Sequence, residues 1–188
     1  MSVSKGRSHL CELPVEVIVD PETGIWMVDG QPMILQPRHA WVGAHKTFEE
    51  TFGLEVYRKA LFGATYEAAR IWCDREAATF DISGVAIFDH YMKRMGQRGF
   101  AQIFVEHFNP EEFFSELRVS HSVYVAEYGA STGRKTCYMF EGAFAGGMES
   151  AFASLGHEVS CRVEEVQLSL IHISEPTRPR LMSYAVFC

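Results

Sequence analysis

Two cysteines and a glutamate in the C-terminal part of the chain have the side-chain types most suggestive of a chemical site. Cys137 begins a predicted helix, and Cys161 and Glu165 fall on one face of a predicted strand, where side chains alternate with a period of two. Thiolates and carboxylates bind zinc when four of them converge tetrahedrally. Cysteines are also common as small buried side chains. The residues alone therefore leave a metal site and a packing role open.

Histidines beside aromatic residues are the second group of candidates. His45 lies on one predicted helical face with Trp41 and Phe48, where it could present its imidazole to a pocket. A hydrogen-bonded core histidine is the more common outcome, and the same two interpretations apply to His90. The chain contains no nucleophile elbow, His-Glu-x-x-His pair or Cys-x-x-Cys motif. No catalytic residue is assigned, and the sequence favours a protein that is not an enzyme.

Composition limits the functions to consider. The chain has 188 residues, of which 47% are hydrophobic, enough for one domain with a real core. A net charge of −7 argues against nucleic-acid binding, and no apolar run is long enough to span a membrane. Five scattered cysteines without a paired pattern are typical of a reducing compartment. We therefore expect a cytoplasmic protein.

The first half of the chain predicts an antiparallel meander followed by helices. Strands are expected at residues 15–19, 25–28 and 33–35. Asp29-Gly30 is a two-residue hairpin signal, and Pro32 places the last strand at an edge because proline cannot donate a ladder hydrogen bond. Helices are expected at residues 37–52, at about 54–78 and after residue 83.

The second half predicts strands at 100–108 and 113–121, an ambiguous segment at 122–128, a long helix and a strand at 159–165. The long helix, which Gly156 can end, contains Gly142, Gly146 and Gly147. Each costs roughly 1 kcal/mol against alanine, so we expect a neighbouring backbone or a ligand to approach closely there. The predicted fold is α+β: an antiparallel sheet with helices packed on it and the glycine-rich helix before the last strand.

The composition changes at Leu168. Residues 168–178, LSLIHISEPTR, resemble an in-frame translation of a common transposase sequencing adapter, and residues 182–188, MSYAVFC, resemble the flow-cell primer read in the same frame. Such scars are excluded from fold reasoning. We therefore predict a flexible leader at 1–13, a single ligand-binding domain at 14–167 that is truncated at its C-terminus, and an artefactual tail at 168–188.

Several motifs resemble the 4-vinyl reductase domain family. The run CYMFEGAFAGGMESAFASLG at 137–156, followed by Glu-Val-Gln at 165–167, is similar to the end of that domain. There a cysteine opens a helix with a G-x-x-x-G core, and a strand ends in E-x-x-C. The hairpin at 24–35 and the segment 121–129 resemble the sensory domains of phenol-responsive transcription activators, which are relatives, as transport-particle subunits are more distantly. The resemblance covers roughly 24–167 and is strongest over 137–167.

This resemblance implies a metal site that the chain completes only in part. In the phenol sensors the opening cysteine, the E-x-x-C pair and a later cysteine bind structural zinc. Cys137 matches the first ligand and Glu165 the glutamate, but Leu168 occupies the position of the next cysteine, and Cys161 lies outside the pattern. The resemblance thus implies zinc in an intact family member and none in this truncated chain.

The implied function is a sensory or regulatory domain in which helices over a sheet enclose a cavity for a hydrophobic or aromatic small molecule. Two alternatives stay open: a reductase-associated protein acting on a vinyl group of a tetrapyrrole, and a protein-interaction module with a filled core. The sequence also leaves open whether the protein forms a homodimer. The expected ligand-binding residues lie on three predicted helices: Trp41, His45, Phe48, Tyr66, Trp72, Phe88 and Tyr91.

Overall fold

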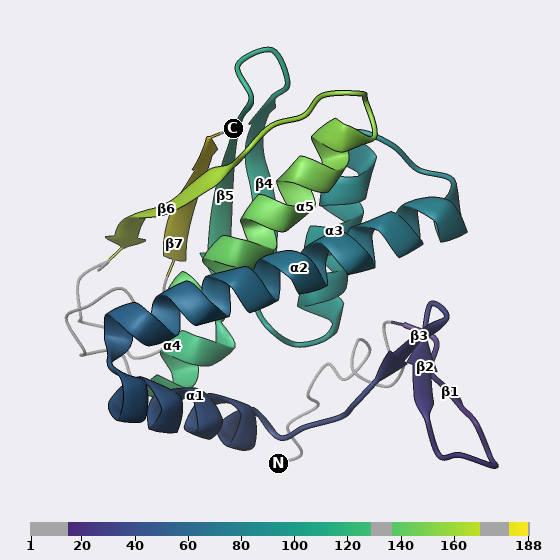
Figure 1. Cartoon of the computed structure of the whole chain (residues 1–188), viewed down its shortest axis with the longest axis vertical. Helices are drawn as coiled ribbons and strands as arrows, with labels where there is room; N and C mark the ends of the chain where they lie inside the picture. The colour runs from purple at the N-terminus through teal and green to yellow at the C-terminus, as the bar shows by residue number, and fades with distance from the viewer. Residues whose placement is uncertain (1–14, 129–136, 170–180, 188) are drawn as a thin grey trace, which may run out of the picture. The chain divides into compact units, whose positions relative to one another are not determined.

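The computed structural model describes residues 15–128, 137–169 and 181–187 (Figure 1). The chain divides into two compact units, Met1–Gln36 and Pro37–Cys188, and each is described by itself. The first unit is a three-stranded antiparallel sheet of β1 (Ile18–Val19), β2 (Trp26–Val28) and β3 (Gln31–Met33).

The hairpin between β2 and β3 is confirmed. Asp29 and Gly30 have φ angles of 51° and 74°, the left-handed values that the favoured two-residue hairpin turn requires. Pro32 lies in β3, an edge strand of this sheet, where its missing N–H leaves no ladder bond broken.

The second unit contains the remaining elements, and the α+β class is confirmed. Its helices are α1 (Arg38–Phe52), α2 (Leu54–Phe80), α3 (Val85–Gln97), α4 (Val123–Tyr128), the 3₁₀ turn η1 (Tyr138–Phe140) and α5 (Glu141–Ala153). Its strands are β4 (Gln102–Asn109), β5 (Phe114–Ser120), β6 (Arg162–Ser169) and β7 (Leu181–Phe187). The ambiguous segment at 122–128 thus becomes a helix.

The four strands form one antiparallel sheet in the order β4-β5-β7-β6. The predicted alternation is visible at the start of β6 and just before it. Cys161, Val163 and Glu165 are buried, whereas Arg162 and Glu164 are exposed. Glu165 is only 1% exposed, so a carboxyl group lies on the covered face of the sheet.

Helix α5 lies at the centre of this unit. Every residue from Glu141 to Phe152 is buried, because one side of α5 faces the sheet and α2 packs across its other side (Figure 1). A helix covered all round must be apolar on all faces or have its polar groups paired. The predicted helix thus exists, although it begins at Glu141 after η1 and not at Cys137.

The glycines of α5 allow this close packing, as predicted. A Cβ atom at Gly146 would lie 2.5 Å from the carbonyl oxygen of Tyr66 on α2, and one at Gly142 would be even closer to the carbonyl oxygen of Phe62. A Cβ at Gly147 would lie 2.9 Å from the ring of Tyr91 on α3. The neighbour that approaches α5 is therefore the backbone of α2 and a ring of α3.

Two predicted boundaries differ from the structure. Residues 168 and 169 continue β6, and Leu181–Phe187 forms β7, which pairs with β5 on one side and β6 on the other. The tail predicted at 168–188 is therefore not outside the fold, because backbone hydrogen bonds can pair a strand of almost any sequence. The chain also divides after Gln36, so 14–167 is not one compact unit. The adapter origin of the tail stays a prediction.

The contact between α2 and α5 predicts opposite effects for two glycine-to-alanine substitutions. Gly146→Ala should lower the free energy of unfolding by about 1–3 kcal/mol, because the new methyl group meets a backbone carbonyl that cannot rotate away. Gly63→Ala, on α2 with nothing within 4 Å of its Cβ position, should raise it by about 0.5–1 kcal/mol. Urea unfolding measures both. Equal effects of the two substitutions would contradict the close contact.

Candidate ligand-binding site

The seven side chains predicted to line one cavity are distributed over three helices. Trp41, His45 and Phe48 are on α1, Tyr66 and Trp72 on α2, and Phe88 and Tyr91 on α3. The three on α1 contact partners that the prediction did not include.

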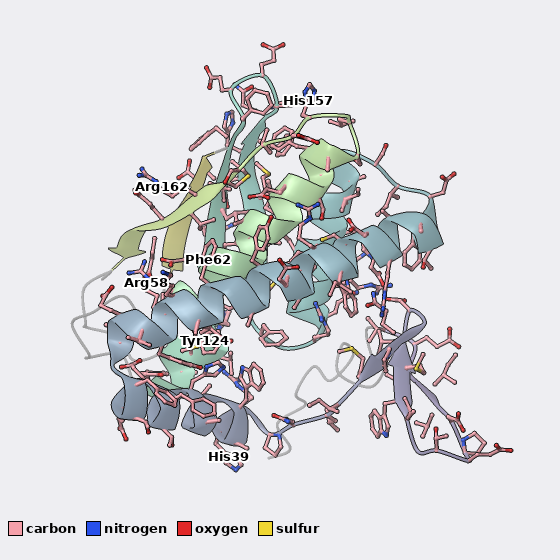
Figure 2. All side chains as sticks on the ribbon, viewed as in Figure 1. His39, Arg58, Phe62, Tyr124, His157 and Arg162 are labelled. Carbon is pink, nitrogen blue, oxygen red and sulfur yellow. The ribbon has the colours of Figure 1, made fainter. Side chains whose placement is uncertain are left out.

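The aromatic cluster, as we call Trp41, His45, Phe48, Tyr57 and Tyr124, joins α1, α2 and α4. The centroid of the His45 ring lies 4.9 Å from that of Trp41, 5.8 Å from that of Tyr57 and 5.6 Å from that of Tyr124. The Phe48 and Tyr57 rings are 5.9 Å apart. Tyr124 lies on α4, between α1 and α2 (Figure 2). His45 is thus surrounded by aromatic rings from three helices.

His45 has one satisfied and one unsatisfied ring nitrogen. The side chain is buried, with a residue exposure of 5%, and its Nδ1 forms a short hydrogen bond with the hydroxyl of Tyr57. Its Nε2 is also buried but has no hydrogen-bond partner among the described residues. Burial lowers the pKa of His45 to about 4, so the imidazole is neutral at pH 7. A buried polar nitrogen without a partner is uncommon in proteins and calls for an explanation.

The two tyrosines of the cluster stay protonated. Burial, with a smaller effect from the negative charge of Glu49, raises the pKa of Tyr57. Burial likewise raises the pKa of Tyr124, whose hydroxyl accepts a hydrogen bond of 3.2 Å from Trp41 Nε1. Both phenols therefore keep a hydrogen that can be donated.

Sequence reasoning missed Tyr57 and Tyr124. Tyr57 lies on an apolar face of the predicted second helix, which is a signal for burial but not for a polar partner. Tyr124 lies in the segment whose structure was ambiguous. Nothing in the sequence indicates that either residue contacts His45.

The predicted residues on α2 and α3 have contacts of their own, and three of the four contact α5. Phe88 is fully buried, and the Tyr91 ring lies against Gly147. The ring of Trp72 lies beneath the guanidinium of Arg98, 4.0 Å from its centroid. Tyr66 donates a hydrogen bond of 2.5 Å to Glu149 on α5.

One pocket of the described residues lies where α2 meets the start of α5. It has a volume of about 270 Å³, is open to solvent, and is lined by Glu55, Arg58, Lys59, Phe62 and Glu141. Arg58 and Phe62 lie on α2 toward the side occupied by β6 (Figure 2). Arg58 donates hydrogen bonds of 2.6–3.1 Å to both carboxylate oxygens of Glu141, and these raise the pKa of Arg58. The guanidinium of Arg58 is therefore already paired with a carboxylate of the same pocket.

Cys137 and Glu165 do not fit a complete zinc site. The thiol of Cys137 is buried, 3.2 Å from the hydroxyl of Ser122, and Cys161 is disulfide-bonded, so it offers no thiolate and departs from the expectation of unpaired cysteines. In the parts of the chain that are described, no set of three metal-binding side chains includes Cys137 or Glu165. Structural zinc needs four ligands.

The fold is that of a known sensory domain. The structure is similar to the crystal structure of the phenol-responsive sensory domain of the transcription activator PoxR with phenol, with a TM-score of 0.69. The two chains share 13% sequence identity over 91% of this chain and 84% of the other. At that identity the likeness establishes the fold alone.

The family is established by the sequence. A family model described as a domain of unknown function (DUF5943) matches residues 11–106, just over half of the chain, and the chain belongs to this family. The matched segment includes His45 and Tyr57 but ends before Tyr124. No curated protein matches the chain. Within the described residues, no helix is long and apolar enough to cross a membrane.

The incomplete ligand set predicts that the protein purifies without stoichiometric zinc, because missing ligands remove most of the binding free energy of a complete site. Elemental analysis after purification in zinc-supplemented medium tests this. Leu168→Cys should increase the zinc content, because it adds a thiolate at the position of the next expected ligand. One tightly held zinc per unaltered chain would refute the assignment.

Proposed function

We propose that this protein is a small-molecule-binding sensory or regulatory domain, and that its ligand binds beside His45 in the aromatic cluster. The observation that carries the proposal is the buried Nε2 of His45, which has no hydrogen-bond partner among the described residues. Leaving such a group unsatisfied costs about 1–3 kcal/mol. A ligand that hydrogen-bonds to Nε2 would recover this free energy.

The surroundings of His45 are those of a small-molecule site. Such sites are mostly apolar and aromatic, with a few polar groups that orient the ligand. Here the rings of Trp41, Tyr57 and Tyr124 supply the apolar walls, and His45 supplies the polar group. This arrangement favours a hydrophobic or aromatic ligand over a charged one.

His45 is also close to solvent along its own helix. Trp41, one turn before it, is 37% exposed, and Phe48, one turn after it, is 47% exposed. Movement of these two side chains would open a path to Nε2 without unfolding α1. The backbone can therefore stay in place while a ligand enters.

The structural comparison gives independent support. A sensory domain that responds to phenol has the same fold, so this fold is compatible with recognising a small aromatic molecule. Membership of the 4-vinyl reductase family, with its phenol-sensor relatives, is part of the same proposal. None of the described contacts indicates a reaction at a tetrapyrrole vinyl group.

An interaction module with a filled core is the second candidate. It is favoured by Phe88 and Tyr91, which pack tightly against α5 and leave no role there for a ligand. In that case the Nε2 of His45 would be satisfied by water, and apolar compounds would not bind.

Ligand binding is tested with toluene and anisole as probes. At one hundred times the dissociation constant, binding stabilises the folded state by about 2.7 kcal/mol, which corresponds to a melting temperature higher by roughly 5–10 °C. In NMR spectra the ring signals of His45 and Tyr124 should shift on titration, and those of His157, which contacts Phe113, should not. Absence of stabilisation, or shifts confined to other residues, would favour the filled-core module.

A further inference from the structure

The hydrogen bond between Tyr57 and His45 determines what the unsatisfied nitrogen can offer. A neutral imidazole carries a single proton, on Nδ1 or on Nε2, so one nitrogen donates and the other accepts. His45 is neutral, and its Nδ1 contacts the protonated hydroxyl of Tyr57. Two arrangements of protons are compatible with this contact.

Counting the unsatisfied groups separates the two arrangements. If Nδ1 carried the proton, the Tyr57 oxygen would accept it, and the hydroxyl hydrogen of Tyr57 would have no other acceptor among the described residues. The lone pair of Nε2 would be unsatisfied as well. If Tyr57 instead donates to Nδ1, only the Nε2–H group lacks a partner. Each additional buried unsatisfied group is unfavourable, so the second arrangement is preferred.

We infer that Tyr57 fixes His45 as an Nε2–H donor and that the site selects a neutral, largely apolar ligand bearing a hydrogen-bond acceptor, such as a carbonyl, ether or phenolic oxygen. This inference rests on the proposed function for the ligand class, but not for the tautomer. Tyr57 is a positioning residue, which acts on the ligand through His45.

Tyr124 reinforces this selection. Its oxygen accepts the hydrogen bond from Trp41, which leaves its own hydrogen without another acceptor among the described residues. The rings of Tyr124 and His45 are adjacent, so the wall of the site carries two donor hydrogens. A ligand oxygen has two lone pairs and can accept from one or both donors. A ligand without a lone pair on oxygen or nitrogen would leave both donor hydrogens unsatisfied.

The tautomer is tested without any ligand. Long-range ¹H–¹⁵N correlation NMR distinguishes a protonated ring nitrogen from an unprotonated one, and His45 should show a protonated Nε2 and an unprotonated Nδ1. Tyr57→Phe keeps the ring but removes the hydroxyl, so the Nδ1 signal should move from its hydrogen-bonded position. A protonated Nδ1 in the unaltered protein would overturn the inference, whether or not the protein binds small molecules.

The ligand class is tested with anisole and ethylbenzene, which differ by an oxygen in place of a methylene group. We expect the ratio of the ethylbenzene to the anisole dissociation constant to fall about three- to tenfold in His45→Phe, because that variant loses the donor. Tyr57→Phe should lower the same ratio and serves if His45→Phe does not fold. An unchanged ratio with both compounds bound would overturn the acceptor selection but leave the proposed function standing. Failure of both compounds to bind the unaltered protein would overturn the acceptor selection and the proposed function together.

Discussion

The close contact between α2 and α5 determines how the rest of the larger unit is arranged. Glycines at positions 142 and 146 let the backbone of α2 lie directly on α5, so α5 is buried on every side. Polar side chains on a helix in that position must find partners. Glu141 pairs with Arg58, Glu149 with Tyr66 and Arg70, and the Ser150 hydroxyl donates to Asp74. Each of these contacts joins α5 to α2, and together they fix the register between the two helices.

The aromatic cluster is built from the elements that this contact holds in place. Gly53, with a φ of 81°, separates α1 from α2 and lets the chain turn back. His45 therefore meets Tyr57, twelve residues later, at the start of α2. At the same end of the contact, where Glu141 pairs with Arg58, η1 leads into α5 and brings Phe140 against Tyr124, with 5.1 Å between the ring centroids. The site thus lies beside the central helix pair, on side chains whose backbones the pair holds still.

Local patterns predicted most of the fold. The Asp29-Gly30 turn, the helices around Gly53, the alternation through Glu165 and the close approach at Gly146 all follow from properties of neighbouring residues. The site could be predicted only in part. His45 and Trp41 share a helical face, but their contacts with Tyr57 and Tyr124 depend on how three helices pack. The strand β7 was not predicted because its residues fall in the segment that was excluded as an adapter-derived tail, and its pairing with two distant strands is visible only in the structure.

In the proposed ligand site the polar anchor is the buried Nε2 of His45, which has no hydrogen-bond partner among the described residues. The most direct test is a crystal structure of the protein soaked with anisole, at a resolution that shows ordered water. We expect density for the ligand in the aromatic cluster, with its oxygen about 2.7–3.2 Å from His45 Nε2. Density for the ligand elsewhere, with a water molecule or a protein group bound to Nε2, would contradict the proposed site.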